Sequence, residues 1–219
     1  MIYVYGVVDE SAKLPAGVRG LERAPLRLSR AGDLAAVYSS HRALSVAPSR
    51  EALLAHEHVV ESLMERLAVL PMRFGTRLDG EEPLQRWLAE HRDELVRAFQ
   101  AIRGRVEFGV RVVPKEGQRV EHQPAASGRA YLMRRLEASR ARERAAHAVH
   151  EPLAAIAAAS ALRPDAPPPA ILAASYLVER SRAEEFSSRV AELDRQREDL
   201  ELVCSGPWPP YSFVQSRAG

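Results

Sequence analysis

The segment AILAASYLVERSRAEEFSSRVAELDRQREDLELVCSGPWPPYSFV, residues 170–214, decides how the second half of the chain folds. It opens with a short apolar run at 171–178 behind a proline-rich break, a pattern that predicts a buried strand. A helix should follow, because apolar residues recur at helical spacing among charged ones. These residues are Phe186, Val190 and Leu193. A second apolar run at 200–205 predicts another strand, so the segment forms a strand, a helix and a strand.

Three local patterns add detail to this segment. Ser181 is followed three residues later by Glu184, the spacing of a capping box, which predicts that the helix starts there. Cys204, the only cysteine, lies in the second predicted strand, so we expect a small buried side chain and no intramolecular disulfide. Residues 206–213, GPWPPYSF, predict a stiff aromatic tail, because their prolines restrict the backbone.

The residues before this segment extend it into a larger layer. Residues 106–113 alternate polar and apolar side chains, as a half-exposed strand does. Residues 128–161 are rich in strong helix formers, which predicts one long helix with a bend or restart at Pro152. With a short strand near 161–163, the order becomes βαββαβ. We therefore expect residues 104–214 to form a modified ferredoxin-like domain.

The first 103 residues predict a separate α+β domain with a small antiparallel or mixed sheet. Residues 2–8 form a compact β-branched and aromatic run, which predicts a strand, and residues 26–39 have the pattern of a hairpin. The predicted fold class is thus α+β in two domains, 1–103 and 104–214, with a flexible end at 215–219.

Two helices are expected after the hairpin. Ser49 should cap the first of them, and Asp79 should cap the second. The apolar stripe of the first helix is Leu53, Val60, Leu63, Met64 and Leu67. The stripe of the second continues without a break over residues 84–102, so we expect a single helix there.

The composition excludes some classes of function. The chain has 219 residues, 46% of them hydrophobic, which allows one large or two modest domains. Its 31 basic and 29 acidic residues leave a formal charge of +2, so no overall field favours nucleic acid or a lipid membrane. No apolar stretch is long enough to span a bilayer, and no basic segment precedes the first apolar run. We expect a cytosolic protein that binds neither nucleic acid nor lipid.

Histidines are the nearest approach to a metal site in this sequence. His56 and His58 are two residues apart on a predicted helix and point in different directions. His147 and His150 could share a face, but no cluster of further ligands completes a site. We therefore expect surface histidines and no metal ion. No glycine-rich phosphate loop, nucleophile elbow or H-E-x-x-H motif occurs, so no residue is assigned to catalysis or to a cofactor.

Two other functions stay open at this point. A ferredoxin-like sheet would suit an RNA-binding module, but base stacking needs aromatics at set places on two strands, and Phe108 stands alone, which favours core packing. A small-molecule enzyme with its site between the two predicted domains is the second alternative, because ligand sites often lie between domains.

Two stretches are candidates for binding a protein partner. The long helix begins with a basic half that includes Arg134 and Arg135, which fits either an acidic partner or a solvated face paired with nearby glutamates. The tail holds Trp208, Pro209 and Tyr211, whose stiff backbone would lose little entropy on binding. The tail aromatics could equally pack on their own domain. Our hypothesis assigns these five residues to partner binding.

Three stretches together give the chain a resemblance to a known family. They are IYVYGV at 2–7, VLPMRFGT at 69–76 and CSGPWPPYSF at 204–213, in this order and over nearly the whole chain. In these stretches the chain resembles the gas vesicle GvpF/GvpL family. The third is the most specific of them, and the first is the least.

The resemblance implies an α+β domain followed by a modified ferredoxin-like domain, with no enzymatic activity and no cofactor. It also implies an accessory or minor structural role in assembling gas vesicles, the hollow protein shells that give microbial cells buoyancy. The implied partners are the small hydrophobic major shell subunit and other gas vesicle accessory proteins. Neither the residues nor the resemblance indicates an oligomeric state.

Overall fold

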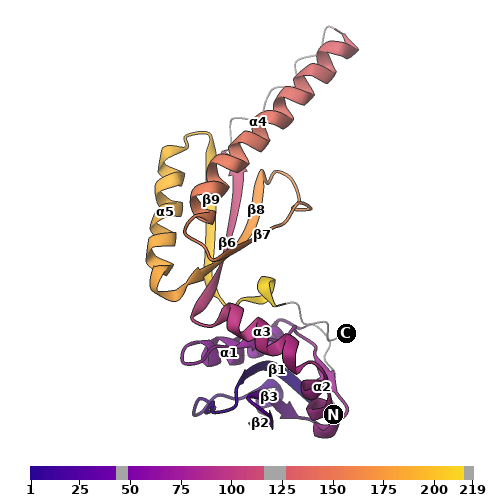
Figure 1. Cartoon of the computed structure of the whole chain (residues 1–219). Coiled ribbons are helices and arrows are strands. Elements are labelled where there is room, and N and C mark those ends of the chain that lie inside the picture. Colours follow the sequence, from indigo (N-terminus) through magenta and orange to yellow (C-terminus); the bar gives the residue numbers. More distant parts are fainter. Residues whose placement is uncertain (43–48, 116–126, 215–219) are drawn as a thin grey trace. The chain divides into compact units, whose positions relative to one another are not determined.

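The computed structural model describes residues 1–42, 49–115 and 127–214 (Figure 1). Its contacts divide the chain into two compact units. The first unit consists of Met1–Arg105 together with Trp208–Gly219, and the second is Val106–Pro207. The domain boundary predicted between residues 103 and 104 stays a prediction.

The first unit is an α+β layer around an antiparallel sheet. Its strands are β1 (Ile2–Asp9), β2 (Leu26–Ala31), β3 (Leu34–Ser40), β4 (Leu70–Pro71) and β5 (Arg77–Leu78). Its helices are α1 (Arg50–Met64), α2 (Glu81–Glu90) and α3 (Arg92–Ile102), with the 3-10 turns η1 (Leu21–Arg23) and η3 (Tyr211–Phe213). The strand order is β2-β3-β1-β4, and β5 also pairs with β1.

The hairpin predicted for the first unit is confirmed. Strands β2 and β3 pair antiparallel up to Ala31 and Leu34, which leaves a two-residue loop. Gly32 in that loop has a φ of +63°, a left-handed conformation that costs glycine little and that tight hairpins require. The hairpin places β3 beside the central strand β1, whose seven leading residues are all buried.

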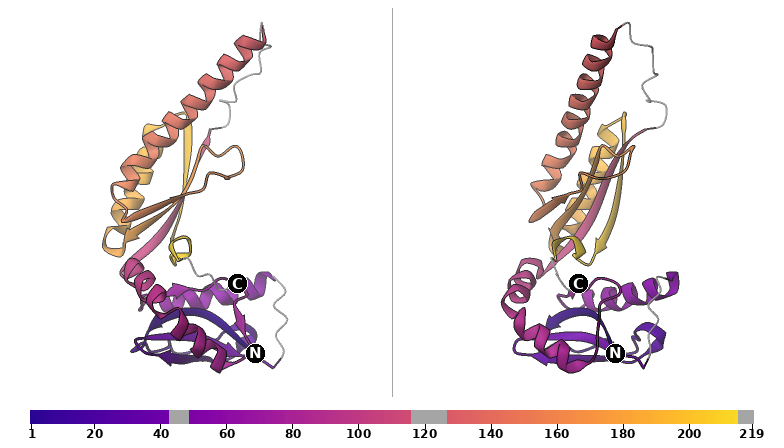
Figure 2. Two further views of the ribbon diagram at one scale, coloured as in Figure 1. Left: turned by 45° about the vertical axis from the view of Figure 1, so that its right-hand side comes forward. Right: turned by 90° about the vertical axis from the view of Figure 1, so that its right-hand side faces the viewer.

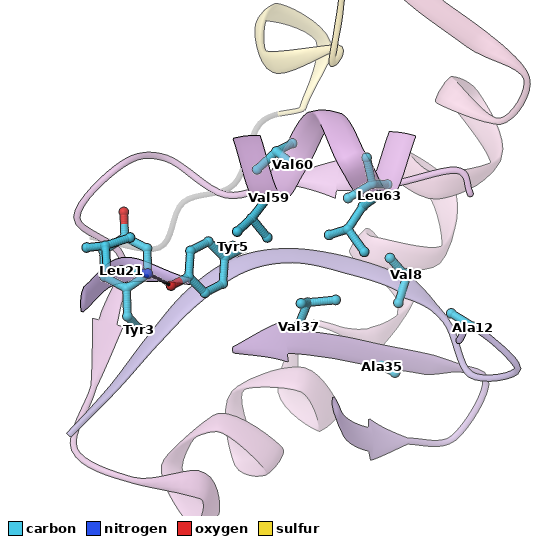
Figure 3. Close-up of a cluster of buried hydrophobic side chains, with 11 residues drawn as sticks. Tyr3, Tyr5, Val8, Ala12, Leu21, Ala35, Val37, Val59, Val60 and Leu63 are labelled. Carbon is cyan, nitrogen blue, oxygen red and sulfur yellow. Dashed lines mark hydrogen bonds between the residues drawn. The ribbon is translucent and has the colours of Figure 1, made fainter. Parts of the chain in front are cut away.

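Helix α1 packs its buried face against this sheet (Figure 3). Ser49 caps the helix, as predicted, by accepting a hydrogen bond from the Ala52 amide. The buried face differs from the predicted stripe, however, because Leu53 is 46% exposed and His56 is fully buried. The buried residues of the helix are His56, Val59, Val60 and Leu63. The expectation of a surface histidine is therefore wrong for His56. Its ring nitrogens lie within hydrogen-bond distance of the Tyr3 and Tyr211 hydroxyls.

The single helix predicted over residues 84–102 is in fact two helices. They meet at His91, which has non-helical backbone angles and whose ring stacks on Trp87 at 5.0 Å between centroids. The cap predicted at Asp79 is also wrong, since the N-cap residue of α2 is Gly80, which has no side chain to accept a hydrogen bond. A continuous apolar stripe does not reveal this break, because each of the two helices buries apolar residues of that stripe.

The second unit has the βαββαβ order that the sequence predicts. Its elements are β6 (Arg105–Pro114), α4 (Gly128–Ala154), β7 (Ala159–Leu162), β8 (Leu172–Glu179), η2 (Arg180–Arg182), α5 (Ala183–Gln196) and β9 (Leu200–Trp208). The strand order is β7-β8-β6-β9, the order of a split βαββαβ layer. Tyr176 on β8 contacts His150 on α4 and Phe186 on α5, so both helices cover one face of the sheet.

Three local predictions in the second unit are corrected. Helix α5 starts after Arg182 without a side-chain cap, and Ser181, the predicted cap, lies in the 3-10 turn η2 before it. Helix α4 includes Pro152 and ends two residues later at Ala154, so it does not restart there, and residues 159–162 form β7 instead of more helix. Cys204 is exposed, although Leu200 and Leu202 of the same strand are buried.

Candidate functional site

The tail after β9 is anchored to the first unit by Tyr211. Pro209 and Pro210 are buried, and the Phe213 amide donates to the Pro210 carbonyl over 3.1 Å, which closes the short turn η3. The Tyr211 hydroxyl donates to Glu57 Oε1 over 3.1 Å and lies 3.3 Å from His56 Nε2. Two residues of helix α1 therefore hold a side chain that is more than 150 positions away in the sequence.

His56 connects this tail to the first strand of the chain. The Gly75 amide donates to the Tyr3 hydroxyl over 3.0 Å, and that hydroxyl lies 2.9 Å from His56 Nδ1. Because the Tyr211 proton goes to Glu57, the consistent assignment has His56 donating from Nε2 to Tyr211 and accepting from Tyr3 at Nδ1. The imidazole is thus neutral and satisfied on both sides.

Burial sets the protonation of these groups. Desolvation lowers the pKa of His56 to about 4, against a smaller opposite effect of its hydrogen bond to the Met72 backbone. Burial raises the pKa of Tyr3 to about 12 and raises the pKa of Tyr211 as well. Burial also raises the pKa of Glu57, while the Tyr211 hydrogen bond lowers it. The imidazole and the phenols are therefore neutral near pH 7 and are joined by hydrogen bonds.

The hydroxyl of Tyr211 should contribute measurably to stability. We expect Tyr211→Phe to lower the unfolding free energy by about 1 to 2 kcal/mol, because a half-buried carboxylate loses its donor. The pKa of Glu57 should rise further in this variant. Urea unfolding at pH 7 measures the first effect, with Tyr131→Phe as the control, since Tyr131 is 51% exposed. Equal stability of the two variants would contradict the anchoring role.

The five residues predicted to bind a partner fall in two groups. Trp208, Pro209 and Tyr211 lie together in the first unit, and Arg134 and Arg135 lie on α4 in the second. Trp208 is 44% exposed, whereas Pro209 is buried and Tyr211 is partly buried. Both arginines are exposed. Trp208 is thus the one tail residue of the three with a largely accessible side chain.

Sequence reasoning missed an apolar surface on the first half of α4. Tyr131, Leu132, Met133 and Leu136 are between 43% and 64% exposed, although all four are large. The buried residues of this helix are Val149 and Leu153, near its other end. Figure 2 shows why: the first half of α4 extends past the sheet of its own unit. The sequence signal for this surface is the cluster of apolar residues at 131–136 inside an arginine-rich stretch.

His147 and His150, the pair that could share a face of the predicted helix, have different partners. His150 Nδ1 lies 2.8 Å from the Tyr176 hydroxyl, and His147 lies on the exposed side of α4, 3.3 Å from Glu151. Within the described residues, no three His, Cys, Asp or Glu side chains are placed to hold a metal ion. Phe108 is 2% exposed and packs on Phe186, so its ring is not available for base stacking.

A hollow of about 340 Å³ lies in the first unit. Its lining includes Arg27, Tyr38, His41 and Glu81. Burial raises the pKa of Tyr38, which moves this phenol away from the range useful for acid or base catalysis near neutrality. In the part of the chain that the structure describes, no helix has the length and apolar character needed to cross a bilayer.

Comparison with known proteins gives consistent results. Residues 1–215 match the family described as gas vesicle synthesis protein GvpL/GvpF. Gas vesicle protein L of Streptomyces sp. (strain CB03234) is 36% identical, over 97% of this chain and 92% of that protein. Gas vesicle protein F of the same strain is 32% identical, over 97% and 99%. The crystal structure of GvpF from Anabaena sp. PCC7120 has the same fold, with a TM-score of 0.83, 20% identity and 98% of each chain covered.

Proposed function

Since the chain belongs to the gas vesicle synthesis protein GvpL/GvpF family, we propose that it assists gas vesicle assembly by binding the small hydrophobic major shell subunit. Membership of this family gives the chain a gas vesicle-related role among structural and assembly proteins. The proposal adds the shell subunit as the partner and assigns the contact to Trp208, Pro209 and Tyr211, with Arg134 and Arg135 as a second contact.

The exposed ring of Trp208 is the observation that carries this proposal. Its indole is 44% exposed, yet the residues that follow it are two buried prolines and the anchored Tyr211. A ring held in this way loses little conformational entropy when it is covered, and tryptophan is enriched among residues that dominate binding energy. The tail therefore presents an apolar group on a stiff support.

A physical reason connects such a group to shell assembly. A small apolar subunit exposes surface before it is incorporated, and exposed apolar patches lead to aggregation. A protein that covers part of this surface would keep the subunit competent for assembly. In our proposal, Trp208 contacts the apolar surface, while Arg134 and Arg135 contact acidic groups of the subunit.

The proposal predicts the result of a pull-down. The tagged chain is co-expressed with the major shell subunit, and the captured subunit is quantified. Trp208→Ala should reduce capture by about tenfold, the usual effect of removing a dominant aromatic contact. The double variant Arg134→Ala/Arg135→Ala should reduce it less, because exposed charge pairs are individually weak.

The control is Leu162→Ala, which removes an equally accessible apolar side chain from β7, where Leu162 is 56% exposed. Thermal unfolding should be unchanged in all of these variants. Undiminished capture by Trp208→Ala would refute the assigned contact. No capture by the unaltered chain would refute the shell subunit as partner and would direct the search to other gas vesicle proteins.

A further inference from the structure

We propose that the first half of α4 carries a docking strip for an acidic amphipathic helix of a partner protein. The strip consists of Leu132, Met133 and Leu136, with Arg129 before them and Arg140 after them. This surface is distinct from the tail around Trp208, and the inference does not depend on binding of the shell subunit.

The strip lies along one side of the helix. Steps of three, one, three and four residues separate its five members, and in an α-helix such steps return to the same side. The strip is about 16 Å long at the usual rise per residue. Its length therefore suits roughly three turns of a second helix.

The apolar centre of the strip is open to solvent. Leu132 is 64% exposed, Met133 49% and Leu136 43%. Single exposed leucines are ordinary on a protein surface, but a contiguous apolar group at helical spacing is typical of an interaction site. The helix has no need of these side chains for its own packing, because the residues that it buries are Val149 and Leu153.

Charge decides which partner fits. Residues 128–144 contain six arginines and two glutamates. A second copy of this chain would bring the same positive charge to the contact, and like charges across an interface disfavour pairing. A helix with an apolar stripe flanked by Asp or Glu matches both the apolar centre and the two terminal arginines. In this mode of recognition two helices pack side by side, and the contacting residues recur at three- and four-residue spacing.

The strip lies away from Arg134 but borders Arg135, which follows Leu132 by three residues and so lies on the same side of the helix. Arg134 follows Leu132 by two residues, which places it about 200° around the helix, nearly opposite the strip. Substitutions in the strip therefore leave that side of α4 unchanged. Arg129 and Arg140, in contrast, lie one turn before and one turn after the apolar residues on the strip itself.

Fluorescence anisotropy with designed peptides tests the inference. The probe is an 18-residue helical peptide with leucines at i, i+3, i+4 and i+7 flanked by glutamates, and the matched control peptide has lysine at each glutamate. The full chain should bind the acidic peptide at least about tenfold more tightly than the basic one, as charge complementarity requires. Equal affinity for the two peptides, or no binding to either, would overturn the inference.

Variants of the chain locate the binding surface. Leu132→Ser/Leu136→Ser should weaken binding of the acidic peptide by about tenfold or more, as the loss of central anchors does. Arg129→Gln/Arg140→Gln should weaken it less and reduce its salt dependence. Ala141→Ser, on an exposed position nearly opposite Leu132, is the control and should have no effect.

Two further measurements keep the outcome decisive. Far-UV circular dichroism should be unchanged in all three variants, because the substituted side chains are exposed. Unchanged peptide affinity in the serine double variant would overturn the inference. Co-sedimentation with vesicles of phosphatidylcholine and phosphatidylserine provides the remaining probe, because a basic amphipathic helix can also bind a lipid surface. Vesicle binding without binding of the acidic peptide would likewise overturn it.

Discussion

Replacing His56 with glutamine should remove much of the acid sensitivity of the first unit. The buried imidazole has a pKa of about 4 in the folded chain against 6.5 for the exposed group. The folded state therefore disfavours protonation, so the stability tied to the neutral ring is complete above pH 6.5 and falls as the pH drops toward 4. Between pH 7 and pH 4.5 the unfolding free energy of the unaltered chain should fall by about 2 kcal/mol more than that of the His56→Gln variant.

Urea unfolding at the two pH values measures this difference. His147→Gln is the matched control, because His147 is exposed. Glu57 has the opposite effect on the pH dependence of stability. Burial raises its pKa, so its protonation on acidification favours the folded state. Because Glu57 is present in every chain compared, its effect cancels in the comparison. Parallel stability curves for the unaltered chain and His56→Gln would show that the ring is not held neutral by burial.

Truncating Phe186 should produce the largest loss of stability in the second unit. The ring is fully buried, with its centroid 5.0 Å from that of Phe108 and 5.3 Å from that of Tyr176. Phe186→Ala leaves a cavity between α5 and the sheet and should cost about 3 to 5 kcal/mol. Denaturant unfolding followed by far-UV circular dichroism measures this loss.

Two companion variants make the Phe186 result specific. Phe186→Leu should restore part of the lost stability, because it refills much of the cavity without the aromatic contacts. Val203→Ala, at a position that is 49% exposed on β9, should change stability by no more than about 0.5 kcal/mol. A loss below about 1 kcal/mol for Phe186→Ala would mean that α5 does not depend on this ring for its packing.

Several elements follow from short-range pattern alone. The turn-like residues 30–33, between the alternating run 26–29 and the apolar run 34–39, predict the hairpin of β2 and β3, which the structure confirms. The apolar spacing of Phe186, Val190 and Leu193 predicts α5 and its buried face, and all three residues are buried. These predictions succeed because the information lies within a few residues of each element.

Other features escaped local reasoning for an identifiable physical reason. The spacing of Ser181 and Glu184 is that of a capping box, but Arg182 binds Glu185 and the Ile156 carbonyl, and a 3-10 turn forms instead. The alternative bond joins residues 26 positions apart, which no local pattern contains. Cys204 similarly lies in an apolar run, but it is exposed, whereas Leu200 and Leu202 of the same strand are buried.

By itself, the sequence determined the α+β class, the βαββαβ order of the second unit and the resemblance to the GvpL/GvpF family, because these follow from local periodicity and short motifs. The tertiary structure decided which side of each helix is covered. It buried His56 rather than Leu53 on α1, anchored Tyr211 to Glu57, and left Leu132 and Leu136 on α4 in solvent. Burial depends on what packs against a helix, and those contacts join residues far apart in the chain.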